Sequence, residues 1–241
     1  MADRAPALRV ALHAHQLVVA DALPAAQRHH VLDPRGHGAS LPRHWFGRRI
    51  RGGRRRHGAR GLLKVALDIN TDHPDYAQLR AQFLQDYHDH MTELTHLFEG
   101  VAHMLTQLEQ AGYTWGIVTN KLEYLALPLI RHLGLAEKCA VTVGGDTTQH
   151  TKPHPEPLLY AAKKAGFAPA DCLYVGDDLR DIQAGQAAGM ATMVAAYGYC
   201  AGDESIGTWQ ADLTVHHAND IWEGVKRWAN GQLPRPTPLA C

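Results

Sequence analysis

The second half of the chain alternates between short apolar runs and segments with helical periodicity. The apolar runs lie at 113–118, 139–143, 172–175, 190–196 and 211–215, and the helical segments at 122–134, 156–166, 181–189 and 219–230. This alternation predicts a parallel α/β sheet with helices on both faces. Ligands of such sheets bind beyond the carboxyl ends of the strands, so reactive side chains should directly follow the apolar runs.

Two further helices are predicted before this region. Apolar side chains at steps of four, four, four and three mark one face of a long amphipathic helix, which we expect to pack into a core. They are Leu79, Phe83, Tyr87, Met91 and Leu94. A second helix begins near Val101 and should end at Gly112, a residue typical of the position just beyond a helix.

Polar residues follow two of the predicted strands at the expected places. Thr119 and Asn120 come directly after the run 113–118 and could bind a phosphate oxygen, although both are also ordinary helix-capping residues. Lys152 stands before the helix at 156–166 between alternating prolines that stiffen the backbone. It could neutralise a phosphoryl oxygen and a carboxylate, or simply lie in solvent.

Three aspartates follow the strand at 172–175. Asp177 and Asp178 are adjacent, and Asp181 lies at the start of the next helix. Carboxylates this close repel one another unless a cation joins them, and oxygen ligands suit Mg²⁺. A helix-capping acidic turn would explain one of the aspartates, but it explains three less well.

The order Thr-Asn, then Lys, then GDDxxD resembles the haloacid-dehalogenase-type hydrolases with a helical cap. The stretches WGIVTNK, TKPHPEPLLYAAKKAG, YVGDDLRDIQAGQAAGM and AAYGY are similar to the phosphoglycolate phosphatase group, and within it to the branch with N-acetylmuramic acid 6-phosphate phosphatases. The resemblance covers residues 57–228. It implies a Rossmann-like core, a small phosphorylated metabolite as substrate and an aspartyl-phosphate intermediate.

The resemblance also implies a role for each motif residue. Thr119 would bind the phosphate with Asn120 beside it, and Lys152 would steady the phosphate and the nucleophile. Asp177 would be a ligand of Mg²⁺, and Asp178 and Asp181 would shape and support that metal site. We therefore take Thr119, Lys152 and Asp177 as the candidate catalytic residues.

The first sixty residues differ sharply in composition. They hold twelve arginines and three aspartates, with no lysine or glutamate, so their formal charge is +9 and that of the remainder is −9. Three interpretations are open: a basic arm for nucleic acid, a disordered tail, or a GC-rich gene read in a shifted frame. We favour the shifted frame, and nucleic acid is disfavoured because the rest of the chain is acidic.

The nucleophile motif of the family is missing from this segment. That motif is an apolar strand ending in DxDGT, whose first aspartate attacks the phosphate and whose second is the acid and base. The nearest aspartates are Asp21, after LVVA, and Asp33, and neither has a second aspartate two positions later. We expect an incomplete central strand, unless LVVA replaces it, and negligible phosphatase activity.

These patterns give four segments: a basic segment without a recognisable fold at 1–56, part of a helical cap at 57–97, an α/β core at 98–230 and a tail at 231–241. No membrane helix is apparent, and four cysteines without a CxxC pair favour reduced thiols in the cytoplasm. Receiver domains are disfavoured because their acidic pair precedes their lysine. A non-catalytic phosphate-binding relative stays open.

Overall fold

The computed structural model of the 241-residue chain describes residues 9–12, 18–20, 30–32, 38–40, 63–64, 69–93, 95–198, 200 and 204–232. Only the backbone is described for the ranges before residue 41. The chain divides into two compact units, Met1–Val19 with His96–Cys241, and Ala20–Thr95.

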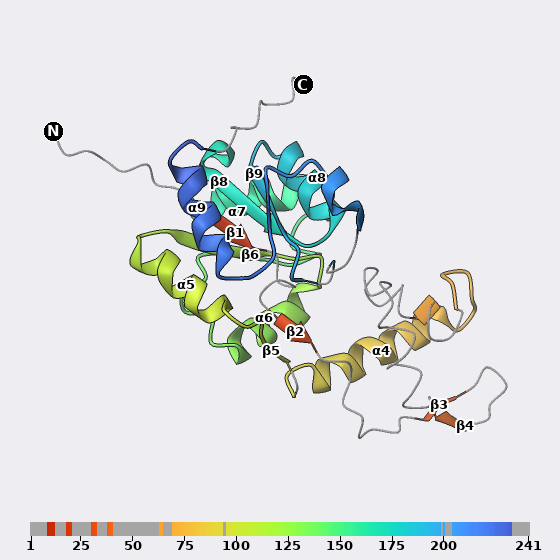
Figure 1. Ribbon diagram of the computed structural model, residues 1–241. Helices are drawn as coiled ribbons and strands as arrows, with labels where there is room; N and C mark the ends of the chain where they lie inside the picture. The colour runs from red at the N-terminus through yellow and green to blue at the C-terminus, as the bar shows by residue number, and fades with distance from the viewer. Residues whose placement is uncertain are drawn as a thin grey trace. The chain divides into compact units, whose positions relative to one another are not determined.

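The first unit contains a six-stranded sheet with the order β10-β9-β8-β1-β6-β7, in which every pair with a described register is parallel (Figure 1). Its strands are β1 (Arg9–Leu12), β6 (Thr114–Val118), β7 (Thr142–Val143), β8 (Cys172–Gly176), β9 (Ala191–Ala195) and β10 (Leu213–Val215). The predicted α/β class with a parallel sheet is confirmed.

The helices between these strands also follow the prediction. They are α5 (Val101–Gln110), α6 (Glu123–His132), α7 (Glu156–Ala165), α8 (Leu179–Ala187) and α9 (Asp220–Ala229). Gly112, Gly134 and Gly166 have positive φ just beyond α5, α6 and α7, a conformation that side chains with a Cβ rarely adopt.

The central strand of the sheet comes from the segment in which no fold was recognised. β1 pairs with β6 on one side, where Leu12 lies opposite Ile117, and with β8 on the other, where Leu12 lies opposite Val175. The expectation of an incomplete central strand is therefore wrong. LVVA does not fill that position either, because β2 (Val18–Ala20) pairs with β5 (Thr95–Leu97) in a separate two-stranded sheet.

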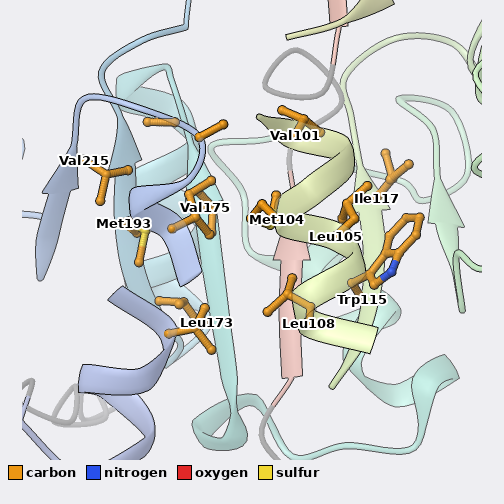
Figure 2. Close-up of a cluster of buried hydrophobic side chains, with 14 of the residues drawn as sticks. Val101, Met104, Leu105, Leu108, Trp115, Ile117, Leu173, Val175, Met193 and Val215 are labelled. Carbon is orange, nitrogen blue, oxygen red and sulfur yellow. The ribbon is translucent and has the colours of Figure 1, made fainter. Parts of the chain in front are cut away.

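Alternating side chains of the strands face two helical layers, as the period of two requires. Trp115 and Ile117 of β6 and Leu173 and Val175 of β8 pack with α5, α6 and α9 (Figure 2). Tyr174, between them in sequence, faces the layer formed by α7 and α8. Both faces of the sheet are thus covered, which leaves its carboxyl edge as the place for a site.

The second unit contains α4 (Tyr76–His90) and a hairpin of β3 (His30–Leu32) and β4 (Gly38–Ser40). The predicted helix is present, but Leu79, Phe83 and Tyr87 are only half-buried and Met91 is buried just beyond it. Leu94 lies outside the described residues. No described helix is long and apolar enough to cross a membrane.

Candidate active site

The loop that follows β6 places Thr119 at the carboxyl edge of the sheet. Its side chain is only 1% exposed, and Thr119 Oγ1 accepts a hydrogen bond from Lys121 N at 3.1 Å. Because the hydroxyl accepts in this contact, it keeps its own proton to donate to an anionic oxygen. The hydrogen bond lies before the N-cap of α6, which is Leu122 and has no side-chain cap, so Thr119 does not cap this helix.

Asn120 connects this loop to the segment that carries Lys152. Asn120 Nδ2 donates to Lys152 O at 3.0 Å, and Lys152 N donates to Asn120 Oδ1 at 3.1 Å. The side-chain amide of Asn120 thus uses one N–H donor and its oxygen to bind the backbone of Lys152, thirty-two positions away in sequence. This reciprocal pair favours a positioning role for Asn120 over direct substrate binding.

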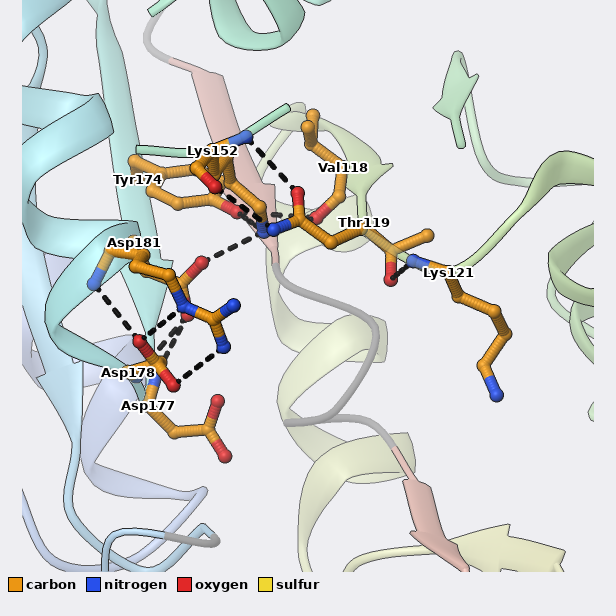
Figure 3. Close-up of polar contacts among 10 residues, drawn as sticks. Val118, Thr119, Lys121, Lys152, Tyr174, Asp177, Asp178 and Asp181 are labelled. Carbon is orange, nitrogen blue, oxygen red and sulfur yellow. Dashed lines mark hydrogen bonds and ion pairs between the residues drawn. The ribbon is translucent and has the colours of Figure 1, made fainter. Parts of the chain in front are cut away.

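The ammonium group of Lys152 is fully enclosed and has three acceptors (Figure 3). Lys152 Nζ lies 2.8 Å from Asp181 Oδ1, 2.7 Å from Tyr174 Oη and 2.9 Å from Val118 O. An ammonium group has three N–H donors, so these contacts account for all of them. Lys152 would have to exchange one of these contacts to bind a phosphoryl oxygen directly.

Burial and charge act in opposite directions on this ammonium group. Burial lowers the pKa of Lys152, while the negative charge of Asp181 and, at longer range, that of Asp177 favour its protonated form. The same burial and the same carboxylates raise the pKa of the Tyr174 phenol well above its usual value. Tyr174 is therefore a neutral phenol, which donates to Val118 O at 3.1 Å while it accepts from Lys152.

Asp181 joins the lysine to the loop after β8. Its Oδ1 atom forms the ion pair with Lys152, and its Oδ2 atom accepts hydrogen bonds from Asp177 N at 3.3 Å and Asp178 N at 3.2 Å. Gly176 permits this approach, because a Cβ atom at that position would lie 2.2 Å from Asp181 Cβ. Both carboxylate oxygens are thus engaged within the protein.

Asp178 is the N-cap of α8 and forms a capping box with Asp181. Asp178 Oδ1 accepts from Arg180 N at 3.0 Å and from Arg180 Nε at 2.9 Å, and Asp178 Oδ2 accepts from Arg180 Nη2 at 2.9 Å. Burial alone would raise the pKa of Asp178, but the hydrogen bonds from Arg180 outweigh it and lower the pKa.

Asp177 is the third carboxylate of the loop and is 3% exposed. Gly198 presses against it, since a Cβ atom there would lie 2.7 Å from Asp177 Oδ2. Burial and the charge of Asp177 raise the pKa of nearby Tyr197, whose buried hydroxyl has no hydrogen-bond partner among the described residues. An unpartnered hydroxyl beside a buried carboxylate fits a place for a hydrated cation.

The aspartates of this loop therefore offer carboxylate oxygens, which are the ligand atoms that a hard divalent ion prefers. Asp177 offers a buried carboxylate. The oxygens of Asp178 and Asp181 bind Arg180, Lys152 and backbone N–H groups. Hard cations prefer several oxygen ligands, of which protein carboxylates usually supply one or two. These contacts favour a supporting role for Asp178 and Asp181 at such a site.

Sequence reasoning did not single out three residues of this site. Tyr174 looked like one more apolar strand residue, although a buried tyrosine hydroxyl usually has a hydrogen-bond partner. Arg180 was visible only as a basic residue two positions after Asp178. Tyr197 lies in AAYGY, which contributed to the resemblance but received no role.

Known proteins resemble this chain in sequence and in fold. The family described as haloacid dehalogenase-like hydrolase matches residues 63–195. The chain belongs to this family. Among curated relatives, a phosphoglycolate phosphatase of Xanthomonas campestris pv. campestris (strain 8004) is 47% identical over 166 residues, which are 69% of this chain and 75% of the relative.

Two further comparisons extend this result. An N-acetylmuramic acid 6-phosphate phosphatase of Pseudomonas aeruginosa is 38% identical over 170 residues, 70% of this chain and 75% of that protein. The crystal structure of a predicted phosphoglycolate phosphatase from Haemophilus somnus 129pt has a TM-score of 0.71 at 23% identity and covers 90% of this chain and 96% of that one. By family, this chain is a phosphatase of the haloacid dehalogenase-like hydrolases with an α/β fold.

Proposed function

We propose that this chain keeps the phosphate-binding half of a phosphomonoesterase site and lacks the reacting half. The buried Lys152–Asp181 ion pair supports this proposal most directly. Removal of two charges from water costs free energy, and the hydrogen bonds that both groups form with their neighbours offset this cost. The ion pair stands at the carboxyl ends of β6 and β8, beside Thr119. Asn120 steadies this arrangement, and Thr119 would donate to the phosphate.

The substrate we propose is a small phosphomonoester that also carries a carboxylate. Phosphoglycolate is the first candidate, because the relative from Xanthomonas campestris is a phosphoglycolate phosphatase. N-acetylmuramic acid 6-phosphate is the second, on the strength of the relative from Pseudomonas aeruginosa. Both molecules join a phosphate ester to a carboxylate, so one cation in the cap could serve either of them.

The divalent ion we propose is Mg²⁺, held by Asp177. Phosphatases of this family generally use a divalent metal, which offsets phosphate charge when bound. Asp181 would orient the loop by holding the N–H groups of Asp177 and Asp178, and Asp178 would fix the start of α8. Because Mg²⁺ usually keeps several waters and is bound through one or two carboxylates, we expect loss of the Asp177 carboxylate to weaken Mg²⁺ binding.

The nucleophile and the general acid and base would come from the residues that follow the central strand. In the family the nucleophile is the aspartate at the end of an apolar strand, with the acid and base two positions later. β1 ends at Leu12, and the sequence continues His13-Ala14-His15. These residues lie outside the described part of the chain, as do Asp21 and Asp33. Because both positions are histidines, neither offers a carboxylate on which an aspartyl-phosphate could form.

Turnover of p-nitrophenyl phosphate with Mg²⁺ tests this proposal. We expect no rate above background for the unaltered chain or for Asp177→Asn, and weaker binding of inorganic phosphate with Mg²⁺ by Asp177→Asn. Turnover that Asp177→Asn abolishes would contradict the missing reacting half. Equal phosphate binding by the two proteins would contradict the role given to Asp177.

A shifted reading frame is our proposed origin of the basic segment. It rests on twelve arginines without a lysine or glutamate in residues 1–60. The nucleotide sequence should then encode DxDGT in another frame near codons 13–17. A gene with no such motif in any frame would instead support a non-catalytic phosphate-binding relative, which should bind phosphosugars without hydrolysing them.

A further inference from the structure

A cluster of histidine and glutamate side chains lies outside the site described above. In the described part of the chain, the His150, His154 and Glu156 side chains form the group of three whose ligand atoms all lie within 4.8 Å of one another. The two histidines are exposed and Glu156 is half-buried. None of the three has a role in the proposed phosphatase reaction.

The backbone holds these three side chains together. His150 N donates to Glu156 Oε2 at 2.9 Å, and Glu156 N donates to His154 Nδ1 at 3.2 Å. The ring centroids of His150 and His154 are 4.2 Å apart. The ligand atoms of the three side chains are therefore close enough to reach one metal ion.

From this geometry we propose a surface site for a borderline transition-metal ion, with Zn²⁺ as the probe. One nitrogen of each imidazole and one oxygen of Glu156 form a three-ligand set, and water would complete the coordination. Imidazole nitrogens favour Zn²⁺, Ni²⁺ and Cu²⁺ over Mg²⁺. The site would thus differ in its metal preference from the all-oxygen surroundings of Asp177.

The proposed metal site lies in the same loop as Lys152. Lys152 lies between His150 and His154 in sequence, and its backbone is held by Asn120. A bound ion would fasten the loop on either side of Lys152 and join it to the first turn of α7 through Glu156. Metal binding at His150, His154 and Glu156 does not require a nucleophile in the phosphatase site.

Labelling with diethyl pyrocarbonate, located by peptide mass spectrometry, tests the proposal residue by residue. The full chain would be labelled alone, with Zn²⁺ and with excess Mg²⁺. We expect Zn²⁺ to slow labelling of His150 and His154 together, Mg²⁺ to leave it unchanged, and exposed His103 and His132 to label equally in all three samples. Equal labelling of His150 and His154 with and without Zn²⁺ would overturn the proposal.

Two variants separate a built site from independent binding at single histidines. In His150→Asn, Zn²⁺ should no longer protect His154 from labelling. The apparent affinity for Zn²⁺ should fall by at least roughly 10–100-fold, which is the loss typical when a residue that only supports a metal ligand is replaced. In the matched control His103→Asn, protection of His154 should be retained. Undiminished protection of His154 in His150→Asn would overturn the shared site. Histidines of residues 1–60 do not confuse this readout, because each peptide is measured separately.

Discussion

At the scale of single residues, the ammonium group of Lys152 has the most constrained surroundings. It is enclosed by a carboxylate, a phenol and a backbone carbonyl oxygen that come from Asp181, Tyr174 and Val118. Val118 ends β6, Tyr174 lies in β8 and Asp181 follows β8. β6 and β8 are the two neighbours of β1 in the sheet. The ion pair therefore joins the two halves of the sheet edge across the central strand.

Replacement of Lys152 should destabilise the fold as well as the site. Lys152→Met leaves Asp181 as a buried charge without its cation, which typically costs about 3–5 kcal/mol. Urea denaturation should show this loss, while exposed Lys163→Met in α7 should change the free energy of unfolding by no more than about 0.5 kcal/mol. Similar stability for both variants would mean that the ion pair is not formed.

Asp178 gives a prediction with a defined pH range. Asp178→Ala removes the N-cap of α8 and should cost about 1 kcal/mol at neutral pH. Although burial opposes it, Arg180 lowers the folded-state pKa below 3.8, so the carboxylate stabilises the fold above that value. The benefit is lost as the pH falls through the folded-state pKa.

Urea titrations of Asp178→Ala and the unaltered chain at neutral pH and below pH 3.8 would check this. The difference between the two proteins should narrow in acid. Exposed Asp171→Ala serves as the control and should show little difference at either pH. A gap for Asp178→Ala that is independent of pH would contradict the assigned role of its charge.

At the scale of elements, α8 packs against the sheet at Gly185, where no space is left for a side chain. Gly185 of α8 is buried, and a Cβ atom there would lie 2.6 Å from Thr192 Cγ2 on β9 and 3.4 Å from Tyr174 Cβ on β8. The side chain of Thr192 is held by a hydrogen bond to Asp212 Oδ2 at 2.9 Å. It cannot yield without the loss of that contact.

Gly185→Ala should therefore destabilise the protein despite the better helix propensity of alanine. The propensity gain is about 1 kcal/mol, whereas overpacking against a held side chain typically costs about 1–3 kcal/mol. Thermal unfolding should show a lower Tm than for Gly207→Ala, where no atom lies within 4 Å of the added Cβ. A Tm at or above that of the unaltered chain would show that α8 can move.

Elements with strong periodicity were predictable from the sequence, and edge elements less so. Helices α5, α7 and α9 follow their apolar spacing within one or two residues. The strand expected at 139–143 is reduced to Thr142–Val143, because β7 is at the edge of the sheet and has a neighbour on one side only. Side-chain partnerships such as Lys152 with Tyr174 depend on strand register, which single-sequence periodicity does not contain.

At the scale of the whole molecule, the central position of β1 was the main surprise. RVAL contains four residues, one of them charged, and lies in a segment rich in arginine and histidine, so its composition gave no strand signal. Its place comes from two parallel neighbours whose backbones both need a partner. Tertiary demand of this kind cannot be seen in a local pattern.

Hydrogen exchange of the backbone amides would check this placement. A strand between two neighbours should exchange only through large-scale unfolding, so amides of β1 should be protected nearly as well as those of β8. Those of the two-residue edge strand β7 should exchange faster. Rapid exchange throughout Arg9–Leu12 would place the central strand elsewhere.

We propose above all that the chain has a phosphate-binding sheet edge but no aspartate nucleophile directly after its central strand. The most direct test is p-nitrophenyl phosphate turnover with Mg²⁺ by the double variant His13→Asp/His15→Asp, beside the unaltered chain. We predict no turnover by the unaltered chain and measurable turnover by the double variant, lost again when Lys152→Met or Asp177→Asn is added. Turnover by the unaltered chain at the rate of the double variant would mean that the chain already has a working nucleophile.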